Sequence, residues 1–173
     1  MTTTETIKNR RSIRKFTDKN ISENDLLSLK EAILRSPSSR GRNPWKFYFV
    51  QNGELLEKLS QCKESGAAFI ADANLAVVVC GDENICDVWI EDCSIASIIL
   101  QLTAHSIGLG TCWVQVRGRN YSNEISSEKF IQTSLNIEKN LRVLSMIAIG
   151  HPAETKTPHE YGELQFDKIT DIK

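Results

Sequence analysis

Residues 87–115, DVWIEDCSIASIILQLTAHSIGLGTCWVQ, form the stretch that decides the fold. Apolar side chains occur on nearly every side of the helical wheel between Val88 and Ile107. A helix that is apolar all round has to be covered all round, and a chain of 173 residues can hardly supply that cover alone. The stretch therefore predicts a buried helix of about five to six turns, and it favours a second subunit packed against it.

Two glycines follow this helix and predict a bend before the next strand. Gly108 is expected to end the helix and Gly110 to open a second tight bend. Residues 111–116 are expected to form a strand, because threonine, tryptophan and valine favour extended backbone. Bare backbone at such a bend suits a flat ligand that contacts main-chain N–H groups. A buried core helix with an ordinary glycine cap is the alternative explanation.

The composition argues against several classes of protein. The formal net charge is −1, with no basic excess for nucleic acid and no acidic tail. The N-terminus lacks the apolar core of a secretory signal, and the longest aliphatic run, 75–80, is too short to span a bilayer. Five cysteines form no C-x-x-C pair, and the three histidines have no metal-ligand spacing. These features predict one cytoplasmic domain, 1–173, with reduced thiols, no metal, and neither a nucleic-acid nor a membrane partner.

A basic strip, residues 8–16, carries five cationic side chains in the sequence KNRRSIRKF. On an extended segment Arg10, Ser12 and Arg14 share one face, because side chains alternate with a period of two. Two guanidinium groups and a hydroxyl match phosphate oxygens well. The strip therefore predicts a phosphate-binding site, and a solvated charged face is the simpler alternative.

The remaining sequence predicts helices and strands in alternation. Strands are expected at 46–50, 75–80, 111–116 and 142–149. Helices are expected at 4–9, 22–36, 52–62, 87–107 and 123–135, with short turns at 65–71 and 137–141. The run 75–80 is typical of a central strand buried on both faces. The loop 36–45 is dense in turn formers. The tail from 153 is polar and would be disordered by composition alone, unless its apolar side chains pack against another surface.

Four of these stretches together resemble the FMN-dependent nitroreductase family. They are RRSIRKF at 10–16, SPSSRGRNPWKF at 36–47, GLGTCW at 108–113 and AIGHPAE at 148–154. The resemblance implies an α+β three-layer sandwich, with a mostly antiparallel sheet flanked by helices, built as an intertwined homodimer. The long helix would then lie in the dimer interface, and the extension 153–173 would pack on the partner subunit.

The resemblance also implies two FMN sites between the subunits. The basic strip would hold the flavin phosphate and the pyrimidine edge, the partner's serine loop would contact the ring, and the segment after the bend would place backbone near flavin N5. No side chain is expected to act as a catalytic acid or base. The residues to which these roles carry over are Arg10, Arg11, Ser12, Arg14, Pro37, Ser38, Ser39, Asn43, Trp113, Val114, Gln115, Val116 and Lys156.

This sequence departs from the family pattern at three places. Gly41 stands where the family often has asparagine, which removes one polar contact to the flavin. Gln115 and Val116 stand where the family often has small residues, and their side chains are expected to narrow the space above N5. No arginine follows residue 142, so Lys156 is the candidate for the phosphate contact that the family commonly makes near the C-terminus.

Three functions follow as hypotheses. The resemblance implies an oxidoreductase that passes hydride from NADH or NADPH through flavin N5 to a nitroaromatic or quinone-like acceptor, in a ping-pong cycle. The departures favour a second hypothesis, a flavin-binding or flavin-sequestering protein with little turnover. A third is a small dimeric protein whose basic strip binds anionic partners; it predicts salt-sensitive binding and no flavin.

Overall fold

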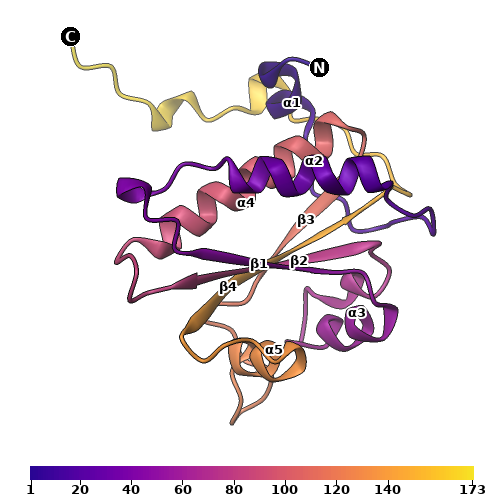
Figure 1. The fold of residues 1–173 in the computed structure, drawn as a ribbon. Helices are drawn as coiled ribbons and strands as arrows, with labels where there is room; N and C mark the ends of the chain where they lie inside the picture. The colour runs from indigo at the N-terminus through magenta and orange to yellow at the C-terminus, as the bar shows by residue number, and fades with distance from the viewer.

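A four-stranded sheet with helices on both faces forms the body of the computed structural model, which describes residues 1–173 (Figure 1). The strands are β1 (Trp45–Val50), β2 (Leu75–Asp82), β3 (Gly110–Gln115) and β4 (Leu141–Gly150). The helices are α1 (Thr3–Asn9), α2 (Glu23–Leu34), α3 (Gly53–Ser60), α4 (Trp89–Ser106) and α5 (Ser127–Leu135). The order β1-β2-β4-β3 is antiparallel throughout and puts β1 and β3 at opposite edges. The predicted α+β sandwich with a mostly antiparallel sheet is confirmed.

The sheet separates two apolar cores. Helices α2 and α4 cover one face, where Leu29 and Leu100 are fully buried, and α3 and α5 cover the other, where Leu59 and Ile131 are fully buried (Figure 1). All residues of β2 are buried, because side chains that alternate along a central strand enter both cores. The prediction of a strand buried on both faces is confirmed for this run.

Helix α4 is covered on one side only. It begins two residues inside the predicted stretch, and Gly108, with a φ of +84°, follows its end as a glycine cap does. Its inner side packs on the sheet and on α2. On its outer side Ile95 and Ile98 remain 39% and 42% exposed. The chain therefore leaves an apolar face of its most apolar helix open. A membrane-spanning helix needs both length and an apolar sequence, and no helix in the structure combines the two.

Helix α5 begins at Ser127, four residues later than predicted. Ser126 caps it, with its hydroxyl accepting from the N–H of Lys129 at 3.1 Å. Asn120 bridges to Ser126, and the Ser122 hydroxyl accepts N–H groups within the loop between them. Both serines offer a cap, and the later one is used because the earlier residues close this narrow loop.

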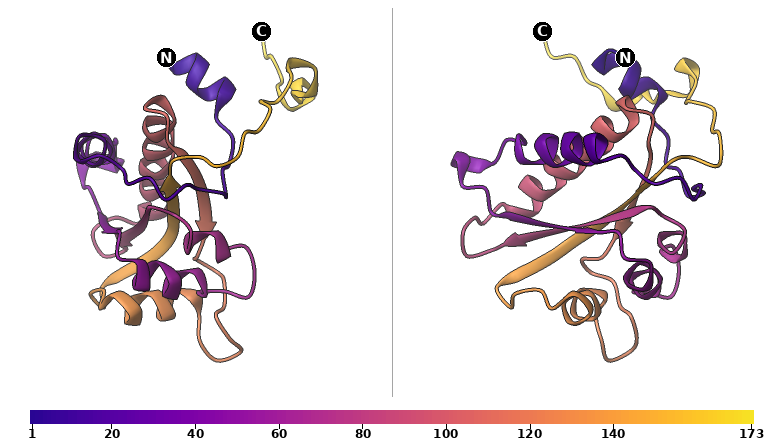
Figure 2. Two further views of the ribbon diagram at one scale, coloured as in Figure 1. Left: turned by 90° about the vertical axis from the view of Figure 1, so that its right-hand side faces the viewer. Right: turned by 45° about the vertical axis from the view of Figure 1, so that its right-hand side comes forward.

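The C-terminal tail leaves β4 and passes α1, at the same end of the molecule (Figure 2). It contains two 3-10 turns, η3 (Tyr161–Glu163) and η4 (Phe166–Lys168). Its apolar side chains are largely in solvent; Phe166 is 50% exposed and Ile169 is 65% exposed. The packing of this tail on a partner subunit stays a prediction.

A carboxylate connects β1 to the turn after α5. Glu138 accepts hydrogen bonds from the Lys46 ammonium and the Tyr48 hydroxyl. These bonds, with that of Lys46 the larger cause, lower the pKa of Glu138 to about 2. Burial, together with the bond to Glu138, raises the pKa of Tyr48. The Lys46 and Glu138 side chains are about half exposed, so solvent screens the stabilisation.

We expect this cluster to lose its stabilising effect in acid. The folded pKa of Glu138 lies below its ordinary value of 4.5, so the contribution is fully present above that pH and is lost as the pH falls toward 2. Glu138→Gln should therefore lower the free energy of unfolding near neutrality and converge with the wild type in acid, as urea titrations at several pH values measure. Glu64→Gln, which removes a carboxylate without hydrogen bonds, is the control. A difference that is independent of pH would contradict the assignment.

Candidate functional site

The basic strip is joined to the outer edge of β3. Ser12 bridges to Thr111, and the N–H of Ile13 donates to the Thr111 carbonyl at 2.9 Å. The segment after β4 pairs with the other side of the strip through the N–H of Ala153. Gly110 permits this close approach, because a Cβ at that position would lie 2.8 Å from the Cβ of Ile13. The strip is therefore held on the sheet and is not a free solvated segment.

Three cations from distant parts of the chain act electrostatically on the thiol of Cys112. They are Arg14, Lys156 and Arg10, and their charges act against the rise that burial causes in the pKa of Cys112. Neither arginine takes part in a salt bridge. Two guanidinium groups without carboxylate partners are free to bind an anion. Cys112 itself is 2% exposed, which argues against a reactive thiol.

Lys156 is fixed beside the strip by its own contacts. Its Nζ donates to the Ser12 carbonyl at 2.7 Å and lies 3.3 Å from Glu154. Glu154 in turn accepts the N–H of Arg14 at 2.6 Å, and this bond, followed by the contacts of Lys156, lowers the pKa of Glu154. Lys156 therefore lies beside the strip, and its role as a phosphate ligand stays a prediction. Arg11 differs from its neighbours, because its guanidinium donates to the carbonyl of residue 157 in the tail.

The outer edge of β3 has no partner strand beyond Thr111. Because the Thr111 carbonyl faces the strip, the alternation of an antiparallel ladder turns the N–H groups of Trp113 and Gln115 to the same open side. Lys63 reaches this side from the segment after α3, and its Nζ donates to the Gln115 carbonyl at 3.2 Å. The edge therefore offers two backbone N–H groups to a ligand.

Side chains at the end of β3 leave this edge open. Val114 and Val116 are fully buried in the core under α3 and α5, so they can offer a ligand only their backbone. The Val116 side chain therefore does not narrow the space at the edge, contrary to the expectation from sequence. The Gln115 side chain is held along the strand; it accepts from the Trp113 indole at 3.0 Å and donates to the Arg117 carbonyl at 2.8 Å.

The serine loop lies at the other edge of the sheet, directly before β1. The Ser38 hydroxyl donates to the Asn43 side chain at 2.7 Å. The N–H of Ser39 donates to Asp92 of α4 at 2.8 Å, which fastens the loop to the start of that helix. Because β1 and β3 are opposite edges, the loop that holds Pro37 and these three residues does not meet the basic strip within one chain.

Two residues at the open edge carry no signal in the sequence. The Arg14 guanidinium lies 5.8 Å from the centre of the Phe69 ring, and Lys63 contacts a strand 52 residues further along the chain. Phe69 falls in the predicted short turn 65–71, and Lys63 falls between this turn and the predicted helix 52–62. Glu154 is the last residue of the motif AIGHPAE at 148–154, but the sequence does not predict the hydrogen bond that it accepts from the N–H of Arg14.

Comparisons with known proteins agree with this geometry. The model of the nitroreductase family matches residues 7–78. A protein of Methanothermobacter thermautotrophicus, provisionally named an NADH dehydrogenase/NAD(P)H nitroreductase, is 39% identical over 153 residues, which cover 87% of this chain and 77% of the relative. An FMN reductase [NAD(P)H] of Bacillus subtilis is 28% identical, over 83% of this chain and 63% of the relative. The structure of an FMN-dependent nitroreductase from Clostridium difficile aligns with a TM-score of 0.95 at 39% identity, over 97% of this chain and 98% of the other.

The fold and these relatives define an oxidoreductase class. The chain belongs to the nitroreductase family. The resemblance drawn from the four sequence motifs is thereby confirmed.

Proposed function

We propose that the chain is an FMN-dependent NAD(P)H oxidoreductase. The observation that carries the proposal is geometric: the strip with Arg10 and Arg14 is joined to β3 at Thr111, Lys156 bonds the Ser12 carbonyl of that strip, and the same edge of β3 turns two N–H groups outward. The names of two similar proteins, an FMN reductase [NAD(P)H] and an FMN-dependent nitroreductase, support it.

The residues present fit FMN in charge and in length. Arg10 and Lys156 offer two cations to a phosphate, and Lys156 is held beside the strip by its bond to the Ser12 carbonyl. The strand from Thr111 to Gln115 spans about 14 Å at roughly 3.4 Å per residue, which gives room for a ring and its phosphate chain along one edge. The N–H groups of this edge would then face the polar side of the ring.

Bound FMN would supply the redox chemistry, by taking hydride from NADH or NADPH at N5 and passing electrons to a nitroaromatic or quinone-like acceptor. The chain would bind and orient the cofactor. The Arg14 guanidinium, fixed over Phe69, would place a positive charge near the ring and favour negative charge there. No side chain needs to act as a general acid or base. Val116 lies in the core, which removes one reason to favour a sequestering protein without turnover.

An absorption spectrum tests this function directly. The purified protein should be yellow, should bleach under NADH or NADPH without oxygen, and should recover its colour when a nitroaromatic or quinone acceptor is added. A protein that binds FMN but is not reduced would support flavin sequestration. A colourless protein that cannot be reconstituted with FMN would contradict the proposal. The third hypothesis, a dimeric protein whose basic strip binds anionic partners, would then remain.

Lys156→Gln should raise the dissociation constant of FMN by about tenfold, since it removes one charge-assisted hydrogen bond. Quenching of FMN fluorescence by the apoprotein measures this constant. Lys139→Gln removes an exposed lysine on the turn after α5 and is the control. Equal constants for the wild type and Lys156→Gln would exclude Lys156 from the phosphate site.

We also propose that two copies form a homodimer that completes the site. The serine loop and the basic strip lie at opposite edges of the sheet, so only a second copy can bring them together. The outer side of α4, with Ile95 and Ile98, supplies an apolar surface for this contact, and Leu27 and Leu34 of the neighbouring α2 are 64% and 65% exposed. The buried Asp92 of α4 fastens the loop beside this surface.

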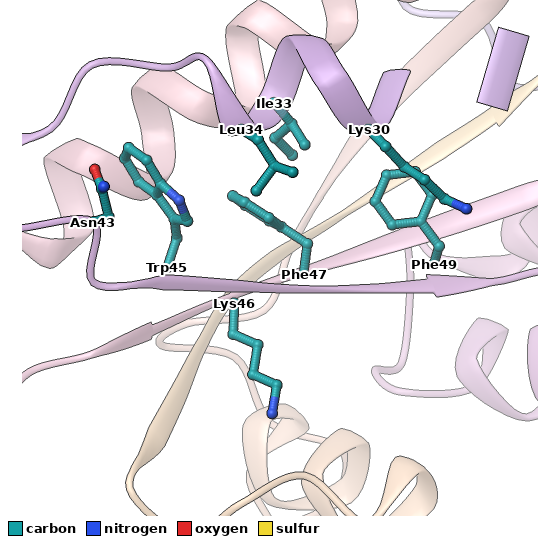
Figure 3. A pocket seen from close by; sticks show the side chains of 8 residues that line it. All are labelled: Lys30, Ile33, Leu34, Asn43, Trp45, Lys46, Phe47 and Phe49. Atoms are coloured by element: carbon teal, nitrogen blue, oxygen red, sulfur yellow. The ribbon is translucent and has the colours of Figure 1, made fainter. Parts of the chain in front are cut away.

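An apolar groove between α2 and β1 suits the partner's tail. Its volume is about 630 Å³, and Trp45, Phe47 and Phe49 face Ile33 and Leu34 across it (Figure 3). Lys30 lies over the Phe49 ring, with 5.7 Å between the ammonium and the ring centre. We propose that residues 161–172 of a second copy occupy this groove. Their exposed apolar side chains match its walls, and their carboxylates match its lysine.

Phe166→Ser should therefore weaken the dimer, because it removes an aromatic ring from the proposed contact. A fully buried phenylalanine contributes about 3–5 kcal/mol. Roughly half of that contribution corresponds to a rise in the dimer dissociation constant of about ten- to seventyfold. Sedimentation equilibrium measures it. Ile125→Ser, at an exposed apolar residue of the loop before α5, is the control. Equal effects of both variants would place the tail elsewhere.

The five free cysteines, all of them buried, support a cytoplasmic location for this oxidoreductase.

A further inference from the structure

The serine loop has a strained backbone. Arg40, Gly41 and Asn43 have φ angles of +54°, +65° and +47°, so three of four consecutive residues lie in the left-handed region. Asparagine tolerates this conformation, but a residue such as Arg40 adopts it at a cost. A backbone of this kind persists only where its surroundings hold it, and it is found most often at functional sites.

One buried side chain holds the loop on the body of the protein. Residues 38–43 make two hydrogen bonds to the rest of the chain. The first is exposed and runs from the Arg42 guanidinium to the Ile85 carbonyl at 3.2 Å. The second is partly buried and runs from the N–H of Ser39 to Asp92 of α4 at 2.8 Å. All other hydrogen bonds of these residues stay within the loop.

Asp92 occupies its position at a cost to the fold. Its side chain is 3% exposed; one carboxylate oxygen accepts the Ser39 N–H, and the other is buried and accepts no hydrogen bond. No cation pairs with it. A buried carboxylate with an unpaired oxygen is unfavourable, and the residues one turn away on either side, Trp89 and Ala96, are buried and apolar. A residue that breaks the local pattern at such a cost points to a role in function.

We propose that Asp92 is a positioning residue for the flavin ring. The inference rests on the proposed function, in which the serine loop of one copy contacts the ring bound by the other. The bond from Ser39 holds the strained loop in one conformation before the ring binds, so binding does not have to order it. Asp92 lies in the first turn of α4, and the loop is thus fixed to the helix that carries the proposed interface. Loss of the bond weakens the contact with the ring and leaves the phosphate contacts of the basic strip unchanged.

FMN and riboflavin separate the two ends of the cofactor, because they share the ring and only FMN carries the phosphate. Quenching of flavin fluorescence by the apoprotein measures both dissociation constants. Asp92→Ala should raise the two constants by the same factor, about tenfold, as one lost charge-assisted hydrogen bond predicts. Lys156→Gln should raise the constant of FMN alone. Asp92→Asn keeps an oxygen that can accept the Ser39 N–H, and it should restore most of the affinity. Glu54→Ala, which removes an exposed carboxylate from the first turn of α3, is the control.

Ser39→Pro tests the same hydrogen bond from the donor side and serves if Asp92→Ala does not fold. It removes the N–H, and the backbone permits it. Ser38 is extended, with φ −138° and ψ 158°, as the residue before a proline should be, and Ser39 is the first residue of a 3-10 turn. Ser39→Ala removes the hydroxyl and keeps the N–H. We expect Ser39→Pro to bind both flavins about tenfold more weakly than Ser39→Ala. In the Asp92→Ala background the two variants should bind alike, because the bond is then already absent.

Three results would overturn the inference for a wild type that is yellow and dimeric. Unchanged riboflavin binding by Asp92→Ala would show that the bond does not act on the ring. The same difference between Ser39→Pro and Ser39→Ala with and without Asp92 would show that other contacts hold the loop. A monomeric Asp92→Ala protein in light scattering would mean that Asp92 supports the interface instead of the ring. A colourless wild type would overturn the proposed function itself.

Discussion

Ile98→Asp should convert the protein into a monomer that no longer holds FMN. Ile98 is 42% exposed on the open face of α4, in the middle of the surface that we propose for the dimer. A carboxylate there would be buried without a partner in the dimer, at a cost of several kcal/mol. Because the serine loop and the basic strip lie at opposite edges of the sheet, loss of the proposed dimer would take the serine loop away from each proposed FMN site.

Light scattering after gel filtration and the ratio of flavin to protein absorption measure the two effects of Ile98→Asp. Ile125→Asp, at an apolar residue that is 41% exposed outside the proposed interface, should change neither quantity. A dimeric Ile98→Asp protein would remove α4 from the interface. A monomer with wild-type FMN affinity would contradict the shared site while leaving the interface in place.

Gly110→Ala should weaken FMN binding by tenfold or more in a protein that still folds. The new Cβ would lie 2.8 Å from both the Cβ and the Cγ2 of Ile13. These atoms are next to the backbone and cannot turn away, so the strip must shift off β3 and carry Arg10 and Arg14 with it. Overpacking of this kind costs about 1–3 kcal/mol of stability, which we expect as a lower melting temperature of the apoprotein.

Fluorescence titration with FMN and thermal unfolding by circular dichroism test this prediction. Gly53→Ala is the control, because a Cβ on Gly53 meets nothing within 4 Å and the residue lies in the first turn of α3. An unchanged FMN dissociation constant in Gly110→Ala would mean that the contact between the strip and β3 does not position the phosphate ligands.

Local sequence patterns predicted the elements but not their order in the sheet. The run 75–80 and the glycine after α4 are strong local signals, and the strands and helices formed close to where they were expected. The placement of β4 between β2 and β3 depends on contacts between distant segments, which periodicity does not report. The start of α5 was misplaced because Ser122 and Ser126 are equally good caps in isolation.

The candidate site was predictable where it follows from one segment and not where segments meet. Alternation along the strip puts Arg10, Ser12 and Arg14 on one face, and the chain pairs that strip with Thr111. Lys63 and Glu154 make contacts across 52 and 140 residues. Lys63 has no neighbouring signal, and the motif AIGHPAE around Glu154 does not predict which segment this carboxylate contacts. The side-chain direction of Val116 depended on the register of β3 with β4, which only the structure supplies.

The segment 153–157 is continuous with the tail, and it holds the arginine strip through Ala153, Glu154 and Lys156. If the tail docks on the other copy as proposed, one continuous segment contacts both the cofactor-binding strip and the partner subunit. Binding of FMN and formation of the dimer are then coupled. Thermodynamic reciprocity then requires FMN to tighten association by the same factor by which association tightens FMN. Dilution should dissociate the dimer and so release FMN, which lowers the flavin absorption per protein. The apparent FMN affinity therefore depends on the protein concentration.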